Sequence, residues 1–93
     1  MSIEVHVRFF GFVDEVPGSR VMLTLPGEAT LGQVLQSLVG TYGHRLEERL
    51  LGKDGHLPDD VKLIIDGEVI DRLDYKVENA TTLYIISQFV GGS

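Results

Sequence analysis

A single apolar stripe at helical spacing lies in the middle of the chain, with strand-like segments before and after it. Its members recur at intervals of three and four residues: Leu31, Val34, Leu35, Leu38, Val39 and Tyr42. Thr30 and Gln33 form a capping-box pattern at its start. This spacing predicts a helix of about three turns that packs one face against a sheet and turns Gln33, Gln36 and Ser37 to water. With only one such helix, the chain has to build most of its core from strands.

Two strands are predicted before this helix. Residues 3–9 alternate between apolar and polar side chains, which is the period-two pattern of a strand with one buried face. The same alternation returns in residues 21–25. Between them, residues 16–19 contain Pro17 and Gly18, which favour a turn because proline presets its own φ and glycine accepts a positive one. The two strands are therefore predicted to form a hairpin.

Three further strands are predicted after the helix. Residues 61–65 are a short β-branched run, and Asp66 with Gly67 is a strong local signal for a two-residue hairpin turn before residues 68–70. Residues 82–87 form the last strand, whose alternate positions face the core or the opposite side of the sheet. The second half of the chain therefore supplies a hairpin and a separate closing strand.

The resulting order of elements predicts an α+β fold with a mixed sheet of four to five strands crossed by one main helix. The first and last strands are the most apolar, so they are placed side by side and parallel in the centre, which is the ubiquitin-like β-grasp arrangement. Residues 44–51 are predicted to add a short turn of helix, and residues 52–58 a surface loop. We expect residues 1–87 to form this domain and residues 88–93 to form a flexible tail.

The composition narrows the possible functions. A chain of 93 residues with 43% apolar content closes one small core and leaves little material for a deep catalytic cleft. The net charge of -6 argues against nucleic acid and favours partners with basic surfaces. No cysteine is present, so disulfides and thiol chemistry are excluded. No apolar run is long enough to cross a membrane, and we expect a soluble, cytoplasmic protein.

Metal binding is not predicted. His6, His44 and His56 lie in separate segments without the short spacing that metal ligands usually show. The acidic pairs at 47–48 and 59–60 do not belong to a recognisable calcium loop. These side chains are interpreted as solvated surface groups.

Four short motifs resemble a known family. They are Val7-Arg8-Phe9-Phe10-Gly11, Thr30-Leu31-Gly32, Asp66-Gly67 and the pair Gly91-Gly92 in the tail. Together they are similar to ubiquitin-like sulfur carriers, above all to the small subunit of molybdopterin synthase (MoaD-like). Thiazole-synthesis carriers (ThiS-like) and archaeal ubiquitin-like modifiers share the fold. The resemblance covers nearly the whole chain.

The resemblance implies a carrier rather than an enzyme, such as the non-catalytic small subunit of a molybdopterin synthase. In this family, an E1-like adenylating enzyme uses ATP to activate the carboxylate of the terminal glycine. The resulting thiocarboxylate then gives its sulfur to a pterin precursor in a larger partner subunit. Carried over to this chain, the resemblance implies activation at Gly92, with Gly91 beside it, and no bound cofactor, metal or catalytic residue.

The tail departs from the family pattern at its end. Ser93 follows Gly92, whereas an activated carrier must end in the second glycine. As written, the tail is blocked, and the chain is expected to be a precursor from which Ser93 is removed. Glycines near a chain end can also be unrelated to function, and this alternative stays open.

A docking surface is predicted on the face of the sheet opposite the helix. Five residues are assigned to it as partner-binding: Phe10, Val69, Tyr84, Ile86 and Phe89. Three of them, Phe10, Val69 and Ile86, match the hydrophobic docking surface of the family. An uncovered apolar patch of this kind marks a protein interface. In the alternative interpretation, Phe10 and Phe12 fold over the sheet as an extension of the core.

Three functions follow as hypotheses. The first is a sulfur carrier in molybdopterin cofactor biosynthesis, with an E1-like enzyme and a large synthase subunit, or an analogous sulfur acceptor, as partners. The second is a ubiquitin-like modifier conjugated to other proteins through Gly92 after removal of Ser93. The third is a non-reactive β-grasp module that binds partners through its sheet alone.

Overall fold

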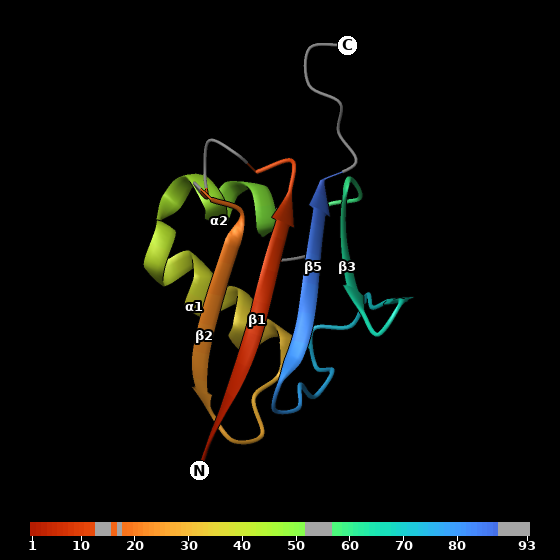
Figure 1. The fold of residues 1–93 in the computed structure, drawn as a ribbon. Coiled ribbons are helices and arrows are strands. Elements are labelled where there is room, and N and C mark those ends of the chain that lie inside the picture. The colour runs from red at the N-terminus through yellow and green to blue at the C-terminus, as the bar shows by residue number, and fades with distance from the viewer. Residues whose placement is uncertain (13–15, 17, 52–56, 88–93) are drawn as a thin grey trace.

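The computed structural model describes residues 1–12, 16, 18–51 and 57–87. Residues 52–56 of the predicted loop and the whole of the predicted tail lie outside these residues. Within the described part, five strands and two helices follow one another along the chain (Figure 1). Their bounds are β1 Ser2–Phe10, β2 Arg20–Pro26, α1 Leu31–Tyr42, α2 His44–Leu50, β3 Val61–Ile65, β4 Glu68–Val69 and β5 Thr81–Ser87.

The strands form one mixed sheet in the order β2-β1-β5-β3-β4. β1 and β5 are parallel neighbours at its centre, and the other neighbouring strands are antiparallel. Both helices lie behind the sheet in the view of Figure 1, which leaves the other face uncovered by them. This α+β, ubiquitin-like β-grasp arrangement confirms the predicted fold, including the central pairing of the first and last strands.

Local sequence signals explain the bounds of α1. The Thr30 backbone amide donates to Gln33 Oε1 at 2.7 Å, and the Gln33 amide donates to Thr30 Oγ1 at 3.3 Å, so the predicted capping box is present. Gly43, with φ of +89°, ends the helix, and its amide donates to the Val39 carbonyl. The apolar stripe then lies against the sheet, with Leu31, Val34, Leu35 and Leu38 fully buried.

The core lies between the sheet and the helices. Val5, Val7 and Phe9 of β1 and Leu83 and Ile85 of β5 are each at most 1% exposed, as their alternation predicts. Burying one such side chain stabilises the fold by about 1.5 to 3 kcal/mol. The inward side chains of the two central strands therefore supply the centre of the core.

Two of the connections between strands contribute to the core. The turn of helix predicted at residues 44–51 is present as α2, seven residues long, which buries Leu46 and Leu50. In the connection between β1 and β2, Phe12 and Val16 are 1% and 0% exposed and belong to the core. The alternative interpretation of the two phenylalanines is therefore correct for Phe12 but not for Phe10, which is 44% exposed.

Candidate functional site

The uncovered face of the sheet, called the outer face below, carries an apolar patch at one end. Strand pairing defines it, because residues directly opposite each other on neighbouring strands point to the same side. Tyr84 lies opposite Ile64, and Ile64 lies opposite Val69. In the next row, Ile86 lies opposite Phe10. These five residues, Phe10, Ile64, Val69, Tyr84 and Ile86, form the outer patch.

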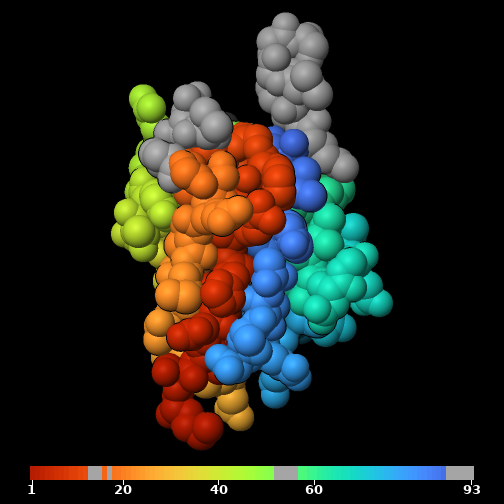
Figure 2. All heavy atoms as spheres, viewed as in Figure 1, coloured from red at the N-terminus to blue at the C-terminus, as the bar shows by residue number. Residues whose placement is uncertain are grey.

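The outer patch is accessible and held in place by its own contacts. Phe10 and Val69 are 44% and 60% exposed, while Ile64, Tyr84 and Ile86 are half-buried. The Phe10 and Tyr84 rings stack with their centroids 6.1 Å apart and an angle of 23° between the planes. In the space-filling view of this face, β1, β2 and β5 lie at the surface without a helix over them (Figure 2). A patch of this kind can bury apolar area against a second protein.

The structure brings together four of the five residues that were assigned to partner binding. Phe10, Val69, Tyr84 and Ile86 share the outer patch. Phe89 lies outside the described residues, as do Gly91 and Gly92. Their roles in docking and activation remain predictions.

Ile64 is a member of the patch that the sequence analysis missed. The run at 61–65 has one polar residue, Lys62, and Ile64, two positions further on, lies on the same side of the strand. The hairpin turn could have revealed it: Asp66 and Gly67 both have positive φ, as a two-residue turn of this type requires. Such a turn pairs Ile65 with Glu68, and therefore Ile64 with Val69.

The end of β5, from which the chain runs on into residues 88–93, is fixed by a side chain from α2. Arg49 Nη2 donates to Ser87 Oγ at 2.8 Å, and Nη1 donates to the Gly11 carbonyl, also at 2.8 Å. Its guanidinium lies 4.2 Å from the centroid of the Phe12 ring, which is a cation–π contact. Arg49 therefore ties α2 to the ends of both central strands, beside the outer patch.

The ends of β1 and β5 can lie close together only because residue 11 is a glycine. Its φ is +89°, and a Cβ added there would lie 2.9 Å from the Ser87 Cβ. We expect Gly11→Ala to lower the free energy of unfolding by about 2 to 4 kcal/mol, from backbone strain and overpacking together. Urea unfolding of purified protein would measure this loss.

Gly40→Ala is the matched control for that substitution. A Cβ at Gly40 meets nothing within 4 Å, and alanine in a helix interior is favoured over glycine by about 0.5 to 1 kcal/mol. The control should therefore be slightly stabilised. Equal stability of the two alanine variants would contradict the proposed close packing at Gly11.

The part of the chain that the structure describes was also searched for metal-ligand groups and membrane-spanning helices. No group of three or more histidine, cysteine, aspartate and glutamate side chains there could hold a metal ion. His44 instead contacts its own helix, with Nδ1 3.2 Å from Glu47 Oε1 and Nε2 2.9 Å from Glu48 Oε1. None of the described helices is both long and apolar enough to span a membrane.

Comparison with known proteins connects this geometry to a family. The model of the ThiS family matches residues 7–92, which include both tail glycines. Small archaeal modifier protein 1 of Haloferax volcanii is 40% identical over 62 residues, covering 66% of this chain and 70% of that protein.

Solved structures share the fold. The crystal structure of SAMP1 from Haloferax volcanii has a TM-score of 0.81 at 25% identity and covers 96% of this chain and 99% of its own. A putative molybdopterin converting factor, subunit 1, from Pyrococcus furiosus has a TM-score of 0.73 at 14% identity, with 94% and 99% covered. The family match across almost the whole chain, together with the β-grasp sheet, leads to one conclusion. The chain belongs to the ThiS family of ubiquitin-like sulfur carriers and modifiers.

Proposed function

We propose that this protein carries sulfur as a thiocarboxylate on Gly92 and donates it in molybdopterin cofactor biosynthesis. The observation that carries the proposal is the family match, which runs through Gly91 and Gly92. It is supported by the outer patch, which lies at the end of the sheet where β5 stops at Ser87. In this proposal the domain docks on a partner and the tail delivers the reacting group.

The chemistry requires activation by a partner. A carboxylate is a poor electrophile, so the E1-like enzyme uses ATP to convert it to an acyl adenylate, whose AMP a sulfur nucleophile can displace. This chain has no cysteine and supplies no such nucleophile. Its own contribution is to present the Gly92 carboxylate, since glycines have no Cβ and can pass through a narrow channel.

Two kinds of partner are needed for this cycle. Members of the family work with E1-like activating enzymes and with acceptor proteins. We assign the acceptor here to a large molybdopterin synthase subunit or an analogous protein. Both partners would use the outer patch, so this protein would engage them one after the other.

Mass spectrometry of the protein isolated from its source organism tests the proposal. We expect a mature form that ends at Gly92 and a fraction of it heavier by the mass difference between sulfur and oxygen. Incubation with the E1-like enzyme, ATP and a sulfur donor should increase that fraction. A population that retains Ser93 throughout would contradict the proposal, because the Gly92 carboxylate would stay in a peptide bond.

A second function is favoured by the 40% identical relative, which is named as a modifier protein. In it, activated Gly92 forms an isopeptide bond with lysines of other proteins. Immunoblots of the source organism should then show a ladder of conjugates that disappears when Gly91 and Gly92 are deleted. A single band of unconjugated protein would contradict conjugation, and activated Gly92 would then serve sulfur transfer alone.

A further inference from the structure

The outer face has a charge opposite to that of the whole chain. The net charge is -6, yet the strand positions that share this face carry Arg8, Arg20 and Lys62. Among the described strand residues on this side of the sheet, Glu4 is the one carboxylate. The basic partner expected from net charge is therefore not the partner that fits this face.

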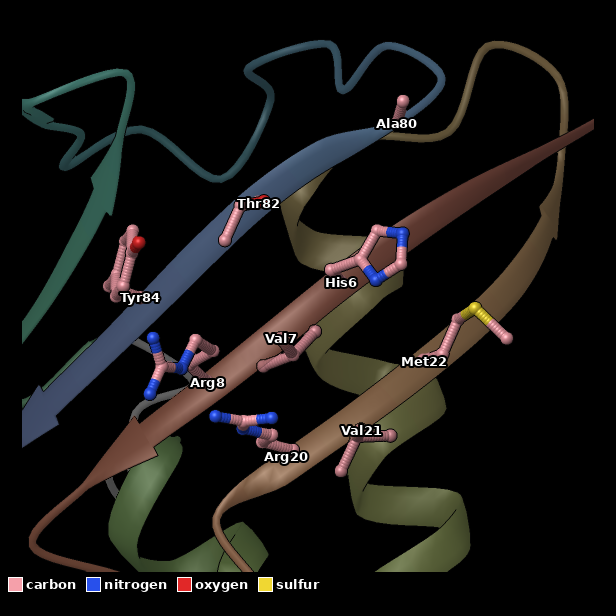
Figure 3. Close-up of a pocket in the computed structure, with 9 residues that line it drawn as sticks. All are labelled: His6, Val7, Arg8, Arg20, Val21, Met22, Ala80, Thr82 and Tyr84. Atoms are coloured by element: carbon pink, nitrogen blue, oxygen red, sulfur yellow. The ribbon is translucent and has the colours of Figure 1, made fainter.

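A groove of about 620 Å³ lies where the positive charge is concentrated. It runs over β2, β1 and β5 and adjoins the outer patch through Tyr84. In Figure 3, Arg8 and Arg20 stand beside each other on neighbouring strands. On β5, Tyr84 lies opposite Arg8 and Thr82 lies opposite His6. His6 and Met22 continue its lining, and Met22 is 61% exposed.

The two arginines are directly opposite each other in the sheet, a placement in which like charges repel. The described residues provide neither of them with an ion pair. Arg8 Nε is buried and has no hydrogen-bond partner. The Arg8 guanidinium lies 5.6 Å from the Phe10 ring centroid and 5.9 Å from that of Tyr84, so the rings hold it in position over the patch.

We propose that this groove binds an acidic segment of the E1-like activating enzyme, whose carboxylates pair with Arg8 and Arg20. The inference rests on the proposed function, which supplies that enzyme as a partner. Carboxylates match the planar guanidinium groups of the two arginines. The outer patch and the groove then form one continuous interface, with an apolar end near Phe10 and a charged end near Arg20.

The surroundings favour a protein over other anions. Tyr84, Phe10 and Met22 offer apolar contact, which free phosphate cannot use. A nucleic acid carries charge along its whole length and would meet the acidic remainder of this chain. A protein segment can be acidic only where it meets the groove, so it satisfies both conditions.

Arg20→Glu tests the proposal, with Arg45→Glu as the matched control. Both arginines are exposed and both substitutions change the net charge equally, but Arg45 lies on α2, away from the groove. Glutamate at position 20 would face Arg8 across the strands, so the variant is expected to fold. The probe is the purified E1-like enzyme of the source organism, and the measured quantity is the association rate constant.

We expect Arg20→Glu to lower this rate constant about tenfold at low ionic strength, because opposite charges steer the encounter. The difference from wild type should shrink as salt is added. Arg45→Glu should change the rate less than about twofold. Equal effects of both substitutions, or no effect of either, would overturn the proposal.

Two further measurements identify other occupants. Sedimentation of the wild-type protein alone would reveal a dimer. If Arg20→Glu caused that dimer to dissociate, a second copy of the chain would be the occupant of the groove and the proposal would be wrong. Competition by inorganic phosphate or by single-stranded DNA at constant ionic strength would point to those anions instead and would also overturn it.

The outcomes for this groove are separable from those for the proposed function. If Gly92 is activated at the same rate in wild type and Arg20→Glu at every salt concentration, the groove proposal fails and the carrier function stands. If the enzyme binds wild type in an Arg20-dependent way but never activates a chain ending at Gly92, the carrier function fails and the groove proposal stands.

Discussion

Replacement of Gly91 by valine is expected to lower the rate at which Gly92 is adenylated at least about 100-fold, since small misplacements of reacting groups cost that much. Valine is β-branched and restricts both its own side chain and the backbone, so the tail would not pass through a channel shaped for glycine. The free energy of unfolding should stay unchanged, since the substitution lies beyond the last strand. ATP–pyrophosphate exchange with the E1-like enzyme measures the adenylation step directly.

A graded pair of variants controls this experiment. Gly91→Ala adds one methyl group and should give an intermediate loss, whereas Gly40→Ala in α1 should leave adenylation at the wild-type rate. All three variants must end at Gly92 so that the carboxylate is free. If Gly91→Val supported ATP–pyrophosphate exchange at the wild-type rate, the tail would not enter a narrow channel, and the proposed need for glycine at position 91 would be wrong.

Replacement of Ile86 by aspartate is expected to weaken binding to the E1-like enzyme by about 2 to 4 kcal/mol, the cost typical of a central interface residue. Ile86 lies between Phe10 and Lys62 in its row of the sheet. A carboxylate there would be buried against the partner without its own hydrogen-bond partners. Calorimetric titration of the enzyme with each variant gives the affinity.

The fold should tolerate that substitution. Lys62 lies directly opposite position 86 and offers the new carboxylate an opposite charge, so we expect a stability loss of about 1 kcal/mol or less. Gln36→Glu, an exposed position on α1, adds the same charge on the other side of the molecule and should leave affinity unchanged. If Ile86→Asp bound the enzyme with wild-type affinity, the outer patch would not be part of the interface.

These two substitutions also separate a carrier from a non-reactive binding module. A carrier needs both regions, so Gly91→Val should bind its partner and fail in activation, while Ile86→Asp should fail in binding. A non-reactive module would depend on Ile86 and would be indifferent to every change at Gly91.

Most of the fold could be predicted because its signals are local. The alternation in β1, the capping box of α1 and the turn at Asp66 and Gly67 each occupy a few adjacent residues, and all of them agree with the same fold. The core role of Phe12 and Val16 could not be predicted in this way. They lie in a connection with no periodicity, and their burial depends on α2 and the sheet closing around them.

The candidate site was predictable only in part, for a related reason. Alternation indicates that Tyr84 and Ile86 point away from the core, but it does not indicate which outward residues of other strands become their neighbours. No pattern in the sequence singles out Arg8 or Arg20 as a pair, although the register places them side by side. The net charge of the chain does not reveal the positive charge of the outer face, because a sum over all residues does not say where the charges lie.

Arg49 shows the same limit at longer range. Its hydrogen bonds reach Gly11 and Ser87, each 38 residues away in sequence. Nothing in the segment around Arg49 distinguishes it from the exposed arginines of the chain. The contact arises only when the helix and both strand ends meet.

The parallel pairing of β1 and β5 has a mechanical consequence. Their register runs from Val5 opposite Thr81 to Phe10 opposite Ile86, with the amino terminus at one end of the pair and the exit of β5 at the other (Figure 1). Tension between the first residue and the tail would therefore load these hydrogen bonds in shear, all together rather than one after another. A protein that is pulled by its tail while it is held at its first residues would resist extension through its two central strands.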